Sequence, residues 1–341
     1  MIYKNIEIHN AAELIECEGG GTSWYRMSKT AYDAAESDAG RQMLRNTTGV
    51  ELRFVMNSPE VTIKLQSVTG TAINYSYQVF YGGIQGGWEC HECMRPVVGS
   101  DVVDCVIKKP NNLDVLKKIA KESGISFDPE VVRVIFNRGS IKIIDVIGDV
   151  EPPKAELLPQ KTVLCYGSSI THGSNALSMP NTWSYLLAHN LDMDIINFGM
   201  AGQCRMEPEI VEYIASLGEQ GKWDVATLEL GINVLSWEDD KIYERVTNTI
   251  NQVAGRNPEK PIFVISPFYC NNDYDGKPHA DKWRRIIKEI CEKLNFKNVT
   301  YVCGTDILGD MSLISADMVH PNIYGVNQIA ERLTHIIKSK I

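Results

Sequence analysis

The pattern of hydrophobic and polar residues changes once along the chain, near residue 150. Before that point apolar residues recur at every second position, which is the period of a strand with one buried face. Turn-forming residues separate strands predicted at residues 50–56, 61–65, 75–81, 102–107, 131–137 and 140–147. One helix is predicted among them at residues 113–123, with Gly124 as its C-cap. Short strands joined by turns favour a β-sandwich of the jelly-roll kind over residues 1–150.

From residue 161 onward, short apolar runs alternate with longer segments of helical period. The predicted strands are residues 163–166, 194–198, 225–230, 262–266 and 299–303, and the main helices are residues 241–254, 281–294 and 323–338. This alternation predicts an α/β domain whose parallel sheet is covered by helices on both sides. Such sheets bind their ligands at the carboxyl ends of the strands.

A proline-rich, acidic segment without periodicity separates the two regions, as is typical of a linker. A length of 341 residues also suits two domains better than one. We therefore predict an accessory β domain at residues 1–150, a linker at residues 151–160 and an α/β domain at residues 161–341.

The charge of the chain argues against a nucleic-acid partner. The formal net charge is −9 and no lysine and arginine residues cluster, so nothing neutralises the phosphates of a nucleic acid. No apolar run has the length of a membrane span, and the first residues lack the features of a signal peptide. We expect a cytoplasmic protein that binds neither nucleic acid nor membrane.

The nine cysteines are an odd number, and Cys165, Cys291 and Cys303 fall in apolar segments that are typical of buried free thiols. Cys90 and Cys93 have the C-x-x-C spacing of metal and redox sites, but no second pair stands at a convincing distance. We therefore interpret this segment as a strand or hairpin.

Several aromatic residues lie nearby, namely Tyr75, Tyr77, Tyr81 and Trp88. Aromatic residues on strands more often belong to the core than to a binding surface, so we interpret them as core. A surface that stacks on sugar rings is the alternative.

The most informative segment is the turn after the first strand of the α/β region. Gly167, Ser168 and Ser169 follow this strand and lead towards a helix near Trp183. A serine in this position lies at the carboxyl edge of the sheet, close to the free N–H groups of a helix start. One of the two serines must face the sheet, which leaves the other available for chemistry.

An acid and a base occur near the end of the chain. Asp317 precedes His320 by three residues, and Pro321 predicts that both lie on a loop before the last helix. Alone, this pair is weak evidence, because such pairs are common in surface loops. Combined with the serine turn, it supplies the remaining groups for nucleophilic catalysis.

Two more turns are predicted at the same edge of the sheet. The strand that ends at Phe198 continues into Gly199, and the strand that ends at Leu230 continues into Gly231 and Asn233. Glycine offers an unobstructed backbone N–H, and asparagine offers a side-chain N–H. Donors of this kind beside a serine form an oxyanion hole.

Together these segments make residues 161–338 resemble the SGNH (GDSL-type) hydrolase family. The family's four blocks are matched in order by Gly167-Ser168-Ser169-Ile170-Thr171, by Asn197-Phe198-Gly199-Met200-Ala201-Gly202, by Gly231-Ile232-Asn233, and by Asp317 with His320. The resemblance implies a flavodoxin-like, three-layer α/β/α fold. The chain departs from the family at Ser168 and Val234, where aspartate is usual.

The resemblance also implies a serine ester hydrolase with a covalent acyl-enzyme and neither metal nor cofactor. The implied roles are Ser169 as nucleophile, His320 as base, Asp317 as the partner that orients the base, and the Ser169 N–H, Gly199 N–H and Asn233 side chain as oxyanion donors. Ser168 is the alternative nucleophile, and Ser168 and His172 are candidate pocket residues.

The order of a β domain and a hydrolase domain is similar to that of two-domain carbohydrate esterases, which remove acetyl groups from plant polysaccharides. That similarity implies a carbohydrate O-acetyl esterase acting on a small-molecule or oligosaccharide ester. The alternatives are a short-chain esterase or lysophospholipase and, in a different class, a non-catalytic carbohydrate-binding protein. The sequence leaves open whether the chain forms a homo-oligomer.

Overall fold

The computed structural model describes residues 1–68, 75–90 and 97–341, which group into two compact units. The first unit contains residues 1–29, 44–160 and 192–194, and the second contains residues 30–43, 161–191 and 195–341. The predicted linker therefore groups with the first unit, and residues 30–43, which lie within the predicted β domain, group with the second unit.

Residues 30–43 join the second unit through polar side chains. They form most of α1 (Lys29–Ala34) and α2 (Asp38–Leu44). Between these helices, Glu36 pairs with Arg245 at 2.7 Å, and Ser37 Oγ donates a hydrogen bond to Gln203 Oε1 at 2.6 Å. These contacts join segments that are distant in sequence, which explains why local periodicity did not reveal them.

The first unit contains two antiparallel sheets. One has the order β1 (Ile2–Tyr3), β2 (Ile6–His9), β5 (Glu51–Met56), β10 (Val131–Phe136), β7 (Tyr77–Tyr81) and β8 (Ile84–Gln85), and β12 (Val150–Glu151) also pairs with β5. The other has the order β3 (Glu13–Glu16), β4 (Thr22–Tyr25), β11 (Ile141–Ile147), β6 (Glu60–Ser67) and β9 (Val103–Lys108). The predicted strands from residue 50 onward are thus confirmed, and α3 has the predicted bounds, Leu113–Ser123.

A single hydrophobic core joins the two sheets. Phe54 of β5 and Phe136 of β10 share it with Ile63 of β6 and Ile143 of β11, and all four side chains are fully buried. Two sheets that face each other across a common core have the packing of a sandwich. The jelly-roll connectivity stays a prediction.

An ionic cluster is buried beside this core. The carboxylate of Glu51 accepts hydrogen bonds from Arg53 Nε at 2.9 Å and from Arg133 Nε and Nη2 at 2.8 and 2.7 Å. Burial alone would raise the pKa of Glu51, but Arg133 and Arg53 hold it well below its usual range. The pairing compensates charges that would otherwise be costly in a protein interior.

Part of the aromatic and cysteine predictions holds. Tyr77 and Tyr81 are buried in the core, whereas Trp88 is 69% exposed. Cys90 ends a short 3₁₀ turn (Trp88–Cys90), so the strand interpretation is wrong there, and Cys93 lies outside the described residues. The eight cysteines within the described residues are free, with Cys165 and Cys291 buried and Cys303 partly exposed.

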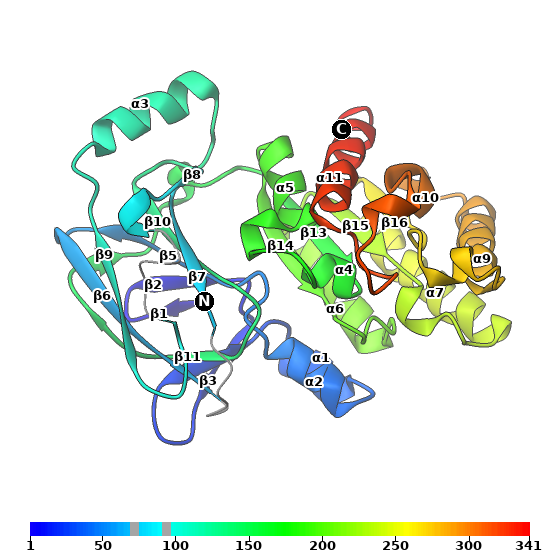
Figure 1. Cartoon of the computed structure of the whole chain (residues 1–341), viewed down its shortest axis with the longest axis horizontal. Helices are drawn as coiled ribbons and strands as arrows, with labels where there is room; N and C mark the ends of the chain where they lie inside the picture. The colour runs from blue at the N-terminus through cyan, green and yellow to red at the C-terminus, as the bar shows by residue number, and fades with distance from the viewer. Residues whose placement is uncertain (69–74, 91–96) are drawn as a thin grey trace. The chain divides into compact units, whose positions relative to one another are not determined.

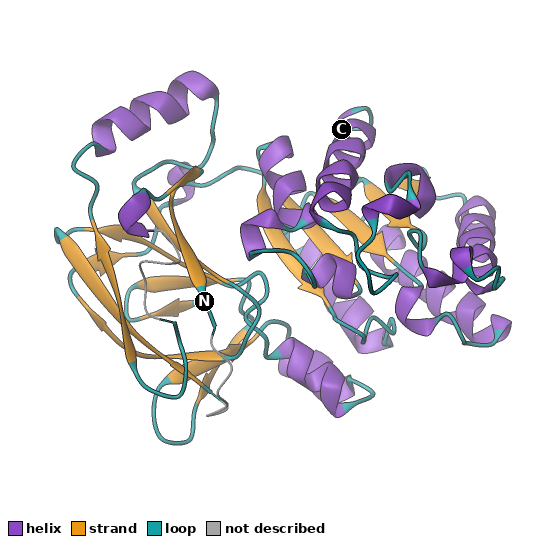
Figure 2. Cartoon of the chain, viewed as in Figure 1, coloured by secondary structure: helices purple, strands orange, loops and turns teal. Residues whose placement is uncertain are grey.

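The second unit is built on a parallel sheet (Figures 1 and 2). Its described strands have the order β14 (Asp194–Gly199), β13 (Thr162–Gly167), β15 (Val225–Glu229), β16 (Ile262–Ile265) and β17 (Val299–Val302). In chain order this is 2-1-3-4-5, the flavodoxin-like arrangement. All five strands were predicted from their apolar runs, because both faces of this sheet are covered.

Helices cover the sheet on both faces (Figure 1). On one face α5 (Trp183–Leu191) packs with α11 (Ile323–Lys338), and on the other α7 (Asp239–Gly255) packs with α6 (Pro208–Glu219) and α9 (His279–Leu294). The short helices α4 (Ser169–His172), α8 (Asn271–Tyr274) and α10 (Gly304–Ile307) follow strand ends or loops. Within the described residues, no helix combines the length and the apolar character that crossing a bilayer needs.

Candidate active site

The predicted serine turn begins where β13 ends. Ser168 is the N-cap of α4, and its Oγ accepts a hydrogen bond from the backbone N–H of Ile170 at 3.1 Å. This cap places Ser169 at the first helical position, with 8% of its surface exposed. Among the described residues, nothing accepts the Ser169 backbone N–H. The turn therefore presents a hydroxyl and a free backbone donor together.

His320 approaches this hydroxyl from the other end of the chain. Its Nε2 lies 2.8 Å from Ser169 Oγ. The histidine is fixed by its loop, in which the His320 carbonyl accepts a hydrogen bond from the Ser315 N–H at 2.7 Å. Just beyond, Asn322 caps α11 by accepting from the N–H groups of Tyr324 and Gly325. The start of the last helix thus fixes the position of the imidazole.

Asp317 completes the arrangement on the far side of the ring. Its Oδ2 lies 2.8 Å from His320 Nδ1, and its Oδ1 accepts from the backbone N–H groups of Val319 and His320 at 3.0 and 2.9 Å. Partial burial would raise the pKa of Asp317, but the hydrogen bonds from His320, Val319 and Ser315 hold it well below its usual range. The carboxylate is therefore ionised at neutral pH and accepts from the Nδ1–H tautomer of His320.

Two side chains that the sequence analysis missed also bind Asp317. Ser315 Oγ donates to Oδ1 at 2.8 Å, and Asn175 Nδ2 donates to Oδ2 at 2.9 Å. Asn175 has a left-handed backbone with φ of +66°, which asparagine tolerates better than most residues. The Ser-x-Asp spacing was a local signal for Ser315, whereas Asn175 is 142 residues from Asp317 and left no signal in sequence.

Ser168 and His172 are both buried, which argues against the prediction that they line a pocket. Ser168 is 1% exposed, and its Oγ donates inward to the carboxylate of Glu229 at 2.7 Å. His172 is 3% exposed, and its backbone N–H bonds to the Ser168 carbonyl at 2.9 Å. Of the two serines, Ser168 is the one that faces the sheet. Glu229 was not recognised, although an ionisable residue in an apolar strand run was a visible signal.

Asn233 has a side-chain N–H that is available to donate, and its role in an oxyanion hole stays a prediction. It lies in a 3₁₀ turn (Ile232–Val234) after β15, and its Oδ1 accepts the backbone N–H of Cys204 at 3.0 Å. This bond fixes the orientation of the amide, with Oδ1 towards the Cys204 N–H and Nδ2 as the free end. Nδ2 has no hydrogen-bond partner among the described residues, and the residue is partly exposed.

Gly199 is a different case, and the structure argues against it as an oxyanion donor. Its N–H already donates to Asn197 Oδ1 at 2.8 Å. A Cβ on Gly199 would lie 2.2 Å from the backbone nitrogen of His172, so this glycine allows β14 and α4 to approach closely. The role of Gly199 is therefore packing.

Three residues later, Gly202 has the properties expected of a donor. Its N–H has no partner within the described part of the chain, and nothing lies within 4 Å of the position of a Cβ. The turn that contains it is anchored to Asn233 through the Cys204 N–H. The second block of the motif therefore still contributes a free backbone N–H, at another glycine.

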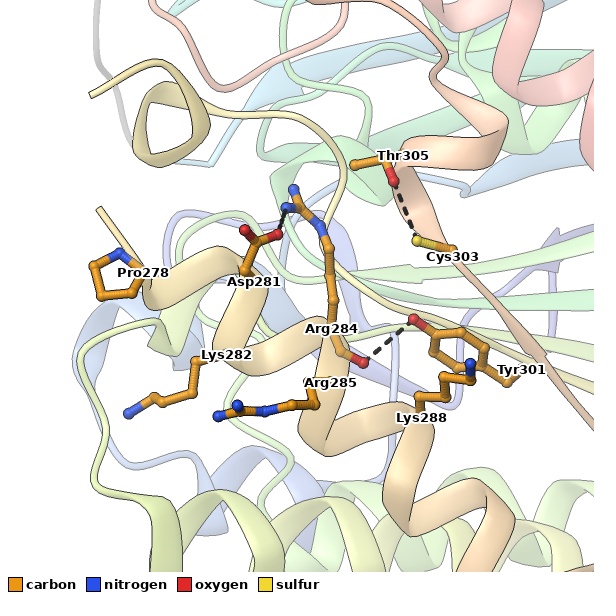
Figure 3. A pocket seen from close by; sticks show the side chains of 9 residues that line it. All are labelled: Pro278, Asp281, Lys282, Arg284, Arg285, Lys288, Tyr301, Cys303 and Thr305. Carbon is orange, nitrogen blue, oxygen red and sulfur yellow. Dashed lines mark hydrogen bonds and ion pairs between the residues drawn. The ribbon is translucent and has the colours of Figure 1, made fainter. Parts of the chain in front are cut away.

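A pocket of about 630 Å³ lies in the same unit and contains none of these residues. It is lined by Pro278, Asp281, Lys282, Arg284, Arg285, Lys288, Tyr301, Cys303 and Thr305 (Figure 3). Arg284 is tied to Asp281 and Asp273 at 2.8 Å or less, and Lys282 pairs with Asp239 at 2.7 Å. Ion pairs thus neutralise much of its positive charge.

Comparisons with known proteins match this architecture. The GDSL-like lipase/acylhydrolase family matches residues 160–338. A search of curated proteins finds no match. Among solved structures, salicylyl-acyltransferase SsfX3 from a tetracycline biosynthetic pathway aligns over 99% of this chain and 96% of its own, with a TM-score of 0.73 and 18% identity.

Two carbohydrate esterases share the same two-part fold. A family two carbohydrate esterase from Clostridium thermocellum, in complex with cellohexaose, covers 98% of each chain with a TM-score of 0.59 and 16% identity. An acetyl xylan esterase from the rumen bacterium Butyrivibrio proteoclasticus covers 99% of this chain and 97% of its own, with a TM-score of 0.57 and 12% identity. The family match and the fold agree: the chain belongs to the GDSL-like lipase/acylhydrolase family.

Proposed function

We propose that this protein is a serine ester hydrolase that works through an acyl-enzyme, with Ser169 as nucleophile, His320 as general base and Asp317 as its orienting partner. The observation that carries the proposal is the continuous line of hydrogen bonds from Ser169 Oγ to His320 Nε2 and from His320 Nδ1 to Asp317, each 2.8 Å long. Such a relay is what an alcohol needs to become a nucleophile at neutral pH.

In the first half of the reaction, His320 Nε2 takes the Ser169 proton as Oγ attacks the ester carbonyl carbon. The imidazolium then donates this proton to the oxygen of the leaving alcohol, and the acyl group stays on Ser169. In the second half, water loses a proton to His320 and attacks the acyl carbon, and His320 returns the proton to Ser169. The ionised Asp317 stabilises the imidazolium in both halves.

The negative charge on the carbonyl oxygen needs donors that are already in place. We assign the Ser169 N–H, the Asn233 Nδ2 and the Gly202 N–H to this role. Support comes from the absence of another acceptor for any of the three among the described residues. It also comes from the bond between the Cys204 N–H and Asn233 Oδ1, which connects the Gly202 turn with Asn233.

For the substrate, we propose an O-acetyl ester of a carbohydrate. The support is the likeness to carbohydrate esterases, which extends over nearly the whole length of both chains and so includes the β-rich unit. A longer acyl chain is the alternative within the same chemistry. The likeness to an acyltransferase adds a second candidate, in which an alcohol rather than water accepts the acyl group.

The test is hydrolysis of p-nitrophenyl esters from acetate to octanoate by wild type, Ser169→Ala and Ser339→Ala. Ser339 follows α11 on the surface, so its variant is the matched control. Activity on acetate that Ser169→Ala abolishes and Ser339→Ala retains supports the esterase. A rate that falls steeply with chain length supports the deacetylase, and a rising one supports the lipid-type alternative. Equal inactivity of wild type and Ser169→Ala on every ester contradicts the proposal and favours a binding protein.

The acceptor and the sugar are tested in the same assay. Acetylated xylo-oligosaccharides with released acetate as the readout test the carbohydrate, because wild type but not Ser169→Ala should deacetylate them. Adding an alcohol acceptor distinguishes hydrolysis from transfer, since a transferase gives a new ester in place of free acid.

A further inference from the structure

We propose that Glu229 is a positioning residue for the nucleophile: its buried carboxylate fixes the turn that carries Ser169. This inference rests on the proposed function. Glu229 is the last residue of β15, is fully buried, and lies on the strand next to β13. The pairing of Leu228 with Tyr166 brings the ends of these two strands level, so the Glu229 side chain reaches the start of the serine turn.

The contacts of Glu229 are concentrated on one oxygen. Oε2 accepts hydrogen bonds from the Ser168 backbone N–H at 2.7 Å, from Ser168 Oγ at 2.7 Å and from Thr171 Oγ1 at 3.1 Å. Ser168 precedes the nucleophile and Thr171 follows it by two positions. One carboxylate oxygen therefore holds Ser168 through its N–H and hydroxyl and Thr171 through its hydroxyl, on both sides of Ser169, which fixes the direction of the Ser169 Oγ and of its free N–H.

The fit of the turn around this carboxylate also depends on Gly167. A Cβ at this position would lie 2.6 Å from Glu229 Oε2 and 2.3 Å from Thr171 Oγ1. Any side chain would thus push the carboxylate away from its donors. The glycine of the serine motif is explained by the close approach of Glu229.

Stability alone does not explain a carboxylate in this place. Within the described residues no lysine, arginine or histidine pairs with Glu229, and its Oε1 is buried without a hydrogen-bond partner. Burial raises the pKa of Glu229 to about 7, and the hydrogen bonds from Ser168 and Thr171 offset part of this rise. A buried acid with one unpartnered oxygen is costly, and proteins keep such groups mainly at functional sites.

The arrangement also gives the serine turn a carboxylate that its own residues lack. The segment Gly167-Ser168-Ser169-Ile170-Thr171 contains no acidic residue. Glu229 supplies one from the neighbouring strand, and Ser168 binds it through both its N–H and its hydroxyl. Serine and glutamate together do the work of orienting the turn.

The test compares Glu229→Ala, which removes the acceptor, with Glu229→Gln, which keeps one acceptor oxygen. Glu207→Gln is the matched control, because Glu207 is 2% exposed in the same unit and burial also raises its pKa. The readouts are kcat and KM for p-nitrophenyl acetate, the rate at which a fluorophosphonate labels Ser169, and circular dichroism for folding.

We expect Glu229→Ala to lower kcat and the labelling rate by about thirtyfold or more, with KM changed by less than about threefold. The kcat and the labelling rate of Glu229→Gln should fall clearly less than those of Glu229→Ala, because the amide keeps one acceptor oxygen for the donors of the turn. Glu207→Gln should behave as wild type. Wild-type rates in a folded Glu229→Ala variant overturn the proposal.

The proposal can still be tested if Glu229→Ala fails to fold. Ser168→Ala removes one of the donors to Glu229 and keeps its backbone N–H, so a smaller fall in kcat and in labelling is expected. If Glu229→Ala does not fold, wild-type rates in a folded Ser168→Ala variant overturn the proposal. Labelling needs no turnover, so it tests Glu229 even if wild type proves inactive on esters, an outcome that contradicts only the proposed function.

Discussion

Ser169 Oγ lies 2.8 Å from His320 Nε2, although the two residues are 151 positions apart in the chain. The parallel sheet explains the contact, because the carboxyl end of β13 and the loop before α11 lie at the same edge of the sheet. A serine and a histidine at hydrogen-bond distance form a reactive pair only if the histidine has the correct tautomer and the transition state is stabilised. The predictions below separate these requirements.

Asp317→Asn should lower kcat for p-nitrophenyl acetate by about 10³- to 10⁴-fold with little change in KM, because an amide no longer enforces the productive tautomer of His320. Steady-state kinetics measure the effect. Asp240→Asn, at an exposed position on α7, is the control and should keep wild-type kcat. A loss of less than about tenfold in Asp317→Asn would show that the imidazole does not depend on this carboxylate.

Asn233→Ala should lower kcat by about 10²- to 10³-fold, the usual loss when one oxyanion donor is removed. KM should change much less, because the bond strengthens only as charge develops on the carbonyl oxygen. The control is Asn327→Ala, on the exposed face of α11. If kcat stays unchanged and kcat/KM falls by this factor only because KM rises, Asn233 acts in substrate binding instead.

Gly199→Ala and Gly202→Ala should differ in stability. The new methyl of Gly199→Ala meets the backbone of His172 at 2.2 Å, and overpacking against backbone costs about 1–3 kcal/mol. Gly202 has φ of +69° and open space around it, so alanine there costs only about 1 kcal/mol of backbone strain. Thermal unfolding of the two variants checks the order, and a more stable Gly199→Ala would refute the packing role of Gly199.

The pKa of Glu229 predicts a pH dependence of stability. It rises from the ordinary 4.5 to about 7 because of burial, so between these values the folded protein keeps a proton that the unfolded chain releases. The stabilising contribution is complete below pH 4.5 and is lost as the pH rises through about 7. Relative to Glu229→Gln, the free energy of unfolding of wild type should therefore decline over this window.

Urea unfolding followed by tryptophan fluorescence measures that difference, since Trp183, Trp223 and Trp283 are buried in the second unit. Glu244→Gln changes an exposed glutamate on α7 and should show no such decline. If wild type and Glu229→Gln vary in parallel over the whole window, Glu229 does not take up a proton there.

Local periodicity was enough to predict most elements of the fold. Helices α3 and α11 have the predicted bounds, and all five strands of the parallel sheet were found, because their signals lie within each segment. The strand-end rule predicts Ser169 at the carboxyl edge of the sheet, and Pro321 predicts Asp317 and His320 on a loop before the last helix. Elements that depend on distant partners were missed: the segment between α1 and α2 is held by one ion pair from Glu36 to Arg245 and one hydrogen bond from Ser37 to Gln203.

The misassigned site residues have the same origin. Gly199 matched a motif, but its availability as a donor depends on where the Asn197 side chain points, which only the folded turn determines. Ser168 was a candidate pocket residue because its partner Glu229 lies 61 residues away, so the sequence around Ser168 contains no signal for this hydrogen bond. Sequence patterns identify the segments that meet at a site, whereas the direction of each side chain depends on its neighbours in three dimensions.

The most direct test of the account is covalent labelling of the nucleophile. Wild type and His320→Asn are treated with a fluorophosphonate, and intact mass with peptide mapping locates the adduct. His335→Asn, at an exposed position on α11, is the control. The account predicts a single adduct at Ser169 in wild type and in His335→Asn, with labelling slowed by at least about a hundredfold in His320→Asn. Labelling at Ser168 or at no serine, or equal rates in wild type and His320→Asn, would contradict it.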